Sequence, residues 1–191
     1  MKNIILIISA VFLSAALHAG ETGSFFDNLE LSVTADALIY NDSAGYGATL
    51  GIMTDLGGKT FMKNFMVGLG ARYKGAVKAD EDFMLNSIGG YGMIGYGFQL
   101  PIGLRIMPAA KVGFLYKISE LNKEIYSGVD LTVFPSLQID YLFKNLRIGI
   151  EGGYLMTFTD TFRNDPAIEN LSRNLQASLF VSYTFRNRFK K

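Results

Sequence analysis

The sequence contains no cysteine and no tryptophan, and its single histidine is His18. Without cysteine, disulfides, thiol catalysis and a lipidated N-terminal cysteine are excluded. Beyond residue 19 there is no histidine either, which excludes a Ser-His dyad and removes the nitrogen and sulfur ligands that zinc prefers. No Asp-rich calcium loop is present in the sequence. We therefore expect a protein that is not an enzyme and that uses no metal and no cofactor.

Long apolar runs are scarce, and residues 4–17 form the one clear case, between Lys2 and Ala19. This is the pattern of a secretory signal peptide, so we expect cleavage after Ala19 and a single domain over 20–191. A membrane-anchoring helix is the alternative, which the short run disfavours. Lys2 is the only charged residue of that segment, and the whole chain has 18 Lys and Arg against 17 Asp and Glu. The rest of the chain therefore has no net charge, and it provides no positive electrostatic field that would attract nucleic acid.

The chain is nevertheless 49% hydrophobic, and the apolar residues alternate with others. Within 104–117, for example, Ile106 and Val112 fall on one set of alternate positions, and Arg105 and Lys111 fall on the other. A β-strand places two such sets on opposite faces. Eight such runs, each about as long as a tilted membrane strand, cover residues 29–39, 46–53, 65–74, 87–98, 104–117, 129–141, 146–157 and 175–185.

Three observations decide which face of these strands is inside. The polar sets are rich in Gly, Ser, Thr and Met, and they carry too few charges for a surface in water. The gaps alternate between short turns (99–103 and 143–145) and long loops (75–83, 118–128 and 158–174), which is typical of outer-membrane barrels. Aromatic residues near the strand ends lie on the apolar faces, where they suit a headgroup belt: Tyr46, Tyr73, Phe98, Tyr116, Tyr141, Tyr183 and Phe185.

The pattern as a whole resembles the small eight-stranded bacterial outer-membrane barrels of the OmpA/OmpX type, and OmpW-like barrels fit it equally well. The resemblance covers residues 25–189 and implies an all-β, antiparallel, up-and-down transmembrane barrel in the outer membrane. The stretch "SLFVSYTF" (178–185) is similar to the C-terminal signal read by the outer-membrane assembly machinery, with contacts implied at Leu179, Val181, Tyr183 and Phe185. The chain departs from that signal because "RNRFKK" follows.

In such a barrel the polar faces line an interior just wide enough for side chains to fill it, and buried charges there must be paired. All charged residues of the runs fall on this face. We expect Arg105 to pair with Asp140, Lys111 with Glu151, and Lys117 with Asp130. The full expected cluster is Glu30, Asp36, Arg72, Lys74, Arg105, Lys111, Lys117, Asp130, Asp140, Arg147 and Glu151.

The expected function is structural or surface-binding, with a lumen plugged by ion pairs and with contacts made by the long loops. The candidate loop contacts are Leu121, Phe162, Ile168 and Leu171. A narrow channel or an OmpW-like conduit for small apolar solutes is one alternative, and an exported, soluble, lipocalin-like binding barrel is another. The "GGKT" at 57–60 is no phosphate loop, because position 53 is Met where that motif requires glycine.

Two prolines conflict with this reading. Pro108 and Pro135 fall in the middle of consecutive strands. Proline cannot donate to a ladder, and a closed barrel has no edge strand that would tolerate it. We therefore expect a bulge or a missing hydrogen bond at each.

Overall fold

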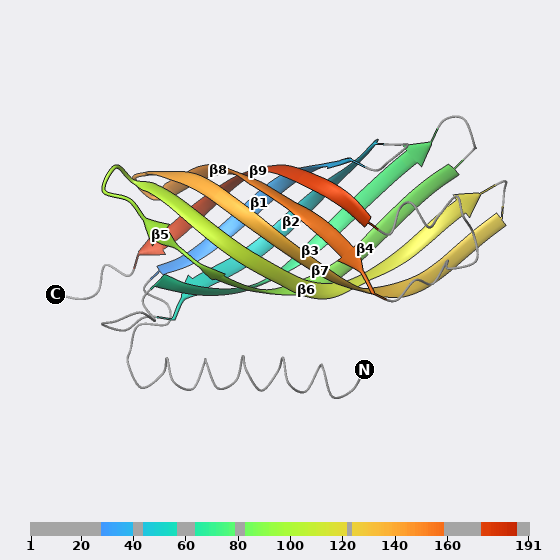
Figure 1. The fold of residues 1–191 in the computed structure, drawn as a ribbon, viewed down its shortest axis with the longest axis horizontal. Coiled ribbons are helices and arrows are strands. Elements are labelled where there is room, and N and C mark those ends of the chain that lie inside the picture. Colours follow the sequence, from blue (N-terminus) through green and yellow to red (C-terminus); the bar gives the residue numbers. More distant parts are fainter. Residues whose placement is uncertain are drawn as a thin grey trace.

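The computed structural model describes residues 28–39, 44–56, 64–78, 83–121, 124–158 and 173–186. The expected signal peptide, its cleavage site and the C-terminal residues 187–191 lie outside these ranges. The described chain is almost entirely β-strand (Figure 1). Its strands are β1 (Asn28–Ile39), β2 (Ala44–Asp55), β3 (Phe65–Lys78), β4 (Phe83–Tyr96), β5 (Phe98–Gln99), β6 (Leu104–Leu121), β7 (Glu124–Phe143), β8 (Leu146–Thr157) and β9 (Arg173–Arg186).

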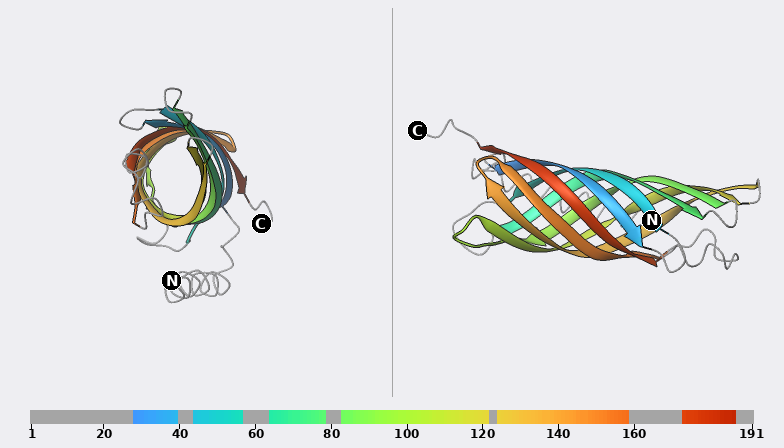
Figure 2. Two further views of the ribbon diagram at one scale, coloured as in Figure 1. Left: turned by 90° about the vertical axis from the view of Figure 1, so that its right-hand side faces the viewer. Right: turned by 90° about the horizontal axis from the view of Figure 1, so that it is seen from above.

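The strands form one closed antiparallel ring, seen end-on in Figure 2. The order β4-β3-β2-β1-β9-β8-β7-β6-β5 is closed by pairing between β4 and β6. The short β5 continues β4 after Gly97, because both pair with β6 in one register, Gly95 opposite Ala109 and Phe98 opposite Ile106. If β4 and β5 are counted as one interrupted strand, the barrel has eight strands, as the alternating sequence predicts.

Both short turns lie at one end of the barrel, which we call the turn end (residues 100–103 and 144–145). At the first, Leu100 N donates to Leu104 O at 2.8 Å, and Gly103 adopts a φ of 85° that glycine tolerates. At the second, β7 and β8 are joined by two residues, and Lys144 has a φ of 58°. The positive φ matches the primed turns that suit twisted hairpins. The opposite end is called the far end.

Two of the expected loops are wrong. Residues 75–83 are not all loop, since β3 continues to Lys78 and β4 begins at Phe83, and residues 79–82 lie outside the described ranges. Residues 118–128 are mostly strand as well, because β6 reaches Leu121 and β7 starts at Glu124, so that the hairpin projects from the far end (Figure 1). The residues here are polar, yet the alternation persists: Ile118 is exposed and Ser119 is buried. Polar composition alone does not end a strand whose backbone hydrogen bonds are made by its partner.

The expected disturbances at the prolines are present as gaps in two ladders, without a bulge. The pairing of β7 with β8 stops at Val133 and resumes at Ser136 in the same register, which leaves out Pro135. The pairing of β6 with β4 and β5 similarly omits Pro108. Between β6 and β7 themselves the ladder is continuous. The backbone nitrogen of each proline, which carries no hydrogen to donate, therefore faces away from the β6–β7 pairing. It points towards the neighbouring strand on the other side, which is β4 or β5 for Pro108 and β8 for Pro135.

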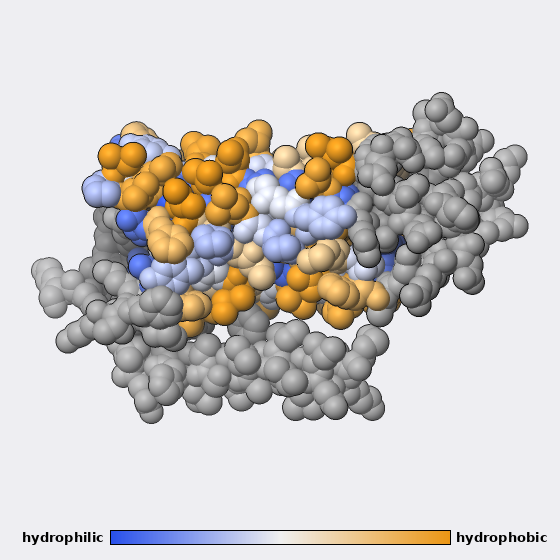
Figure 3. Space-filling view, in the orientation of Figure 1, coloured by the Kyte–Doolittle hydropathy of each residue, from blue (hydrophilic) through white to orange (hydrophobic). Residues whose placement is uncertain are grey.

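The barrel is apolar outside and polar inside. Exposed side chains include Leu50 (59%), Ile148 (59%) and Leu179 (67%), and hydrophobic residues cover much of the surface in Figure 3. All seven aromatic residues assigned to the headgroup belt are exposed. A soluble barrel would bury this face, so the lipocalin-like alternative is wrong. No helix in the described ranges is long and apolar enough to span a membrane.

Candidate functional site

The interior near the turn end is filled by two arginines and two carboxylates that come together from four strands. Arg105 donates from Nε to Asp140 at 2.9 Å and from Nη1 to Glu30 at 3.0 Å. Arg147 donates from Nη1 to Asp140 at 2.8 Å and from Nε to Glu30 at 3.1 Å. All four side chains are buried. We call this group the tetrad (Glu30, Arg105, Asp140 and Arg147); its charges balance, and each carboxylate bridges both arginines.

A separate ion pair, outside the tetrad, lies nearer the middle of the barrel. Lys111 Nζ lies 2.6 Å from a carboxylate oxygen of Glu151. The other oxygen accepts hydrogen bonds from Ser136 at 2.7 Å and Gln138 at 3.1 Å. Strands β6 and β7 thus supply these three partners of the Glu151 carboxylate, which lies on β8. Satisfied partners on both oxygens are what a charge buried in this interior requires.

A further ion pair lies towards the far end of the barrel. Lys117 Nζ and a carboxylate oxygen of Asp130 are 2.5 Å apart, and Asp130 is fully buried. The three pairs expected from alternation, Arg105 with Asp140, Lys111 with Glu151 and Lys117 with Asp130, are thus all ion pairs in the structure.

The remaining three charges of the expected cluster are buried but do not form ion pairs within the described part of the chain. Asp36 accepts a hydrogen bond from Thr49 at 3.0 Å. Lys74 donates to Gln176 at 2.7 Å. The guanidinium of Arg72 lies 4.5 Å above the ring of Tyr91, a cation–π contact. The sequence led us to expect an acid in contact with each buried cation, whereas the close contacts of these two cations are an aromatic face and an amide carbonyl.

Two apolar clusters inside the barrel were not foreseen. One contains Leu115, Phe134 and Leu155. The other consists of Tyr91 and four methionines: Met53, Met66, Met93 and Met107. The available signal was their position in the polar, inward set of each run. It was missed because the inward set was read for its charges alone.

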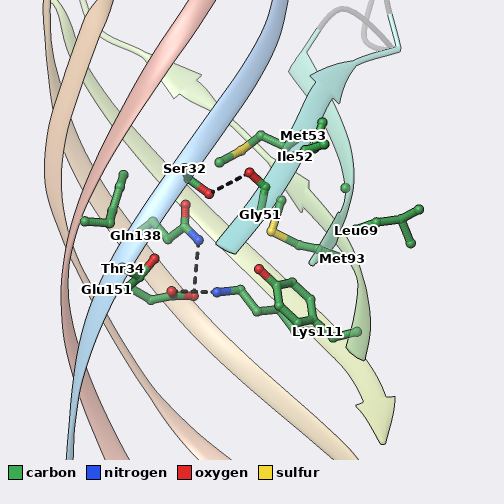
Figure 4. A pocket seen from close by; sticks show the side chains of 13 residues that line it. Ser32, Thr34, Gly51, Ile52, Met53, Leu69, Met93, Lys111, Gln138 and Glu151 are labelled. Atoms are coloured by element: carbon green, nitrogen blue, oxygen red, sulfur yellow. Dashed lines mark hydrogen bonds and ion pairs between the residues drawn. The ribbon is translucent and has the colours of Figure 1, made fainter. Parts of the chain in front are cut away.

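A small cavity lies beside the methionine cluster and the Lys111–Glu151 pair (Figure 4). Its volume is about 20 Å³, enough for one water molecule. Ser32, Thr34, Met53, Met93 and Gln138 are among its lining residues. In the described ranges, no three His, Cys, Asp or Glu side chains are grouped so as to hold a metal ion.

The candidate loop contacts are placed less fully. Phe162, Ile168 and Leu171 lie outside the described residues. Leu121 ends strand β6 rather than lying in a loop. The four residues of the expected assembly signal, Leu179, Val181, Tyr183 and Phe185, all lie on β9 and are exposed on the outer face.

No family model and no curated protein matches the chain. Solved structures do match it. A major outer membrane protein from Thermus thermophilus has a TM-score of 0.60 at 16% identity, covering 82% of this chain and 99% of that one. Neisserial surface protein A has a TM-score of 0.57 at 13% identity, covering 83% and 96%. The outer membrane enzyme PagL has a TM-score of 0.48 at 16% identity, covering 80% and 98%.

The first two likenesses show the fold, an eight-stranded antiparallel barrel of the kind found in outer membranes. The surface agrees with that fold, because apolar side chains face outward and charged side chains face inward. The chain is therefore an integral β-barrel of the bacterial outer membrane.

Proposed function

We propose that this barrel is a non-catalytic outer-membrane protein with a plugged lumen, acting as a structural element or through binding at its extracellular surface. The observation that carries the proposal is the tetrad, in which arginines from β6 and β8 hold carboxylates from β1 and β7 across the interior. An eight-stranded barrel is just wide enough to be filled by side chains. Four bridged ionic groups at one level leave no continuous aqueous path of porin size.

Further layers support the plug along the rest of the barrel. Above the tetrad follow the methionine cluster, the Lys111–Glu151 pair, the cluster around Phe134, and the Lys117–Asp130 pair. A solute would have to displace both ionic and apolar contacts to pass. Catalysis finds no support in the lumen either, since the sequence supplies no imidazole or thiol beyond His18.

Single-channel recording in planar bilayers tests the plug. We expect no steady conductance of porin size from the unaltered protein, with a sixteen-stranded porin inserted into the same bilayer as the positive control. A steady porin-sized conductance from the unaltered barrel would overturn the proposal.

The surface role requires the far end to be extracellular and the turn end to be periplasmic. The cysteine-free sequence permits a direct test by single-cysteine labelling. The variant Ser127→Cys, near the far end of β7, is expected to react with a membrane-impermeant maleimide on intact cells. The variant Lys144→Cys, in the turn between β7 and β8, is expected to react only after the cells are opened. The reverse labelling pattern would contradict the proposed orientation.

The surface role also predicts which residues matter in the cell. Substituting serine for the candidate contacts Leu121, Phe162, Ile168 and Leu171 together should abolish complementation of a deletion strain. The lumen variant Arg105→Lys, which keeps the charge, should still complement. If the lumen variant alone lost complementation while the surface variant kept it, the role would lie in the interior instead.

A conduit for small apolar solutes is the second candidate, and the gaps in the ladders at Pro108 and Pro135 favour it. Such gaps weaken the wall on both sides of the β6–β7 hairpin. Replacing both prolines by valine would restore the donors and should reduce uptake of an apolar dye if solutes leave through the wall. If cells with the unaltered protein, cells with the double variant and cells without the protein all took up the dye equally, this candidate would be wrong.

A further inference from the structure

Strand β7 has an open edge where it projects from the far end of the barrel. On one side it pairs with β6 from Glu124 to Tyr141. On the other side it pairs with β8 only from Thr132 onward. Within the described ranges, no residue pairs with this second side of 124–129. We call this segment the β7 edge; it belongs to the part of the hairpin that extends beyond the end of β8 (Figure 1).

The backbone groups of Ile125, Ser127 and Val129 face the open side. Phe158 N donates to the carbonyl of Leu131 at 2.9 Å, so this carbonyl points away from β6. Successive residues of an antiparallel strand direct their N–H and C=O groups to alternate sides. Every second residue before Leu131 therefore points the same way. The three residues present their N–H and C=O groups to any strand that adds to the β7 edge.

The β7 edge carries none of the usual protection against pairing. Natural edge strands are commonly blunted by charged side chains, by proline or by a bulge. Residues 125–129 read "IYSGV" and contain neither a charged residue nor proline. Their pairing with β6 runs one to one, without a bulge. Ile125 is 74% exposed and Val129 is 48% exposed, and such an edge is a template for β-strand addition.

We propose that the β7 edge pairs with the same edge of a second copy of this chain, carried by a facing membrane. This inference rests on the proposed surface role and names its partner. Two identical edges pair antiparallel about a twofold axis. An axis at Ser127 sets this serine against its own counterpart and Ile125 against the counterpart of Val129. Each of these pairs exchanges two backbone hydrogen bonds, branched apolar side chains meet each other, and the outward row brings no like charges together.

The twofold axis also decides which membranes the two copies occupy. An axis that relates two antiparallel strands of one sheet is perpendicular to that sheet. The pairing of β6 with β7 is continuous from the barrel wall into the hairpin, so the hairpin extends the wall. A twofold rotation about an axis perpendicular to the wall reverses the direction of the barrel. Two copies with the same orientation in one membrane therefore cannot pair in this way, and the contact joins two facing surfaces.

Cysteine cross-linking tests the register, because the sequence contains no cysteine. The Cα atoms of a hydrogen-bonded antiparallel pair are about 5.5 Å apart, a separation that a disulfide spans. The mature chain with Ser127→Cys, inserted into lipid vesicles, should form a disulfide-linked dimer under a mild oxidant. Ile125→Cys and Val129→Cys should each form little dimer alone, but vesicles of one should cross-link to vesicles of the other. Equal cross-linking by each of the three variants alone would overturn the twofold pairing.

Vesicle clustering tests the pairing itself. Vesicles that carry the unaltered barrel with its far end outward should cluster, as measured by light scattering against protein-free vesicles. Ser127→Pro removes one N–H from the open edge and should abolish clustering, whereas Ser127→Ala keeps this N–H and should cluster like the unaltered barrel. Both variants should fold, because the N–H of Ser127 points away from β6 and an edge tolerates proline. If Ser127→Pro failed to fold, the cross-linking experiment would still decide the matter.

No clustering by the unaltered barrel, or equal clustering by Ser127→Pro and Ser127→Ala, would overturn the self-pairing. The surface role would survive that result if Ser127→Cys were still labelled on intact cells. A third pattern would identify a different occupant of the edge. If the unaltered barrel failed to cluster vesicles, while Ser127→Pro lost complementation of a deletion strain and Ser127→Ala kept it, the edge would bind a strand of another protein and the self-pairing would be wrong.

Discussion

Arg105 and Glu30 bind each other across the full width of the barrel. Nη1 and Nη2 of Arg105 donate to the two carboxylate oxygens of Glu30 at 3.0 and 3.1 Å. Their strands, β6 and β1, are separated by three strands in either direction around the ring. This fork-to-fork contact therefore ties opposite walls together, while Nε of the same arginine binds Asp140 of the adjacent strand β7.

Removing Arg105 should destabilise the barrel strongly. Arg105→Met leaves the carboxylates of Glu30 and Asp140 buried with only Arg147 to neutralise them. Breaking a buried pair from one side typically costs about 3–5 kcal/mol. The free energy of unfolding, measured by urea titration in detergent micelles, should fall by that order.

The control for this prediction is Arg105→Lys, which keeps the charge but cannot bind both carboxylates through a planar fork. Its loss of stability should be smaller than that of Arg105→Met. If both variants unfolded at the urea concentration that unfolds the unaltered protein, the tetrad would not stabilise the fold.

Lys111 and Glu151 should be energetically coupled. A double-mutant cycle with Lys111→Met and Glu151→Gln compares the two single variants with the double variant. For buried partners 2.6 Å apart, a coupling of about 0.5–3 kcal/mol is expected. Because the pair is shielded from solvent, this coupling should change little between low and high salt. Additive single effects would show that the ion pair contributes nothing specific.

Gly70 should be intolerant of a side chain, in contrast to Gly152. A Cβ at Gly70 would overlap the ring of Tyr91 and lie 2.5 Å from the backbone carbonyl of Leu50, so Gly70→Ala should cost about 1–3 kcal/mol. No atom lies within 4 Å of a Cβ at Gly152, and Gly152→Ala should be neutral or stabilising by up to about 1 kcal/mol. Thermal unfolding measures both effects. It can be followed on detergent gels of unboiled samples, where the folded and the unfolded barrel migrate differently. Equal effects would mean that the interior repacks freely around Tyr91.

Charge on the outer face should be costly only where that face meets hydrocarbon. Leu179 is 67% exposed in the middle of β9, and Leu179→Arg should destabilise the barrel by about 2–4 kcal/mol in lipid bilayers. Ile125 is 74% exposed near the far end of β7, where the hairpin projects beyond the rest of the barrel, so Ile125→Arg should cost about 0–1 kcal/mol. Unfolding in vesicles distinguishes the two variants. Similar losses for both would place the hairpin tip inside the bilayer.

Much of the fold follows from the sequence because a strand alternates strictly. The inward or outward direction of Arg105, Lys111 and Lys117 could be read from their spacing alone. Cross-strand partners such as Arg105 and Asp140 were also accessible, since a hairpin places residues at equal distances from its turn opposite each other. The ends of the strands were not accessible where polar residues continue the alternation, as at Ser119, because pairing rather than composition decides how far a hairpin extends.

The sequence by itself determined the two faces of each strand, the number of strands and the medium that surrounds them, because these properties repeat locally along the chain. The tertiary structure alone decided the contacts across the lumen, since they depend on how the ring closes. Closure places Arg105 against Glu30, holds Arg72 over the ring of Tyr91, and gathers Met53, Met66, Met93 and Met107 from four strands. Residues so far apart in sequence carry no local pattern that would announce their meeting, and only the geometry of a narrow closed barrel brings their side chains together.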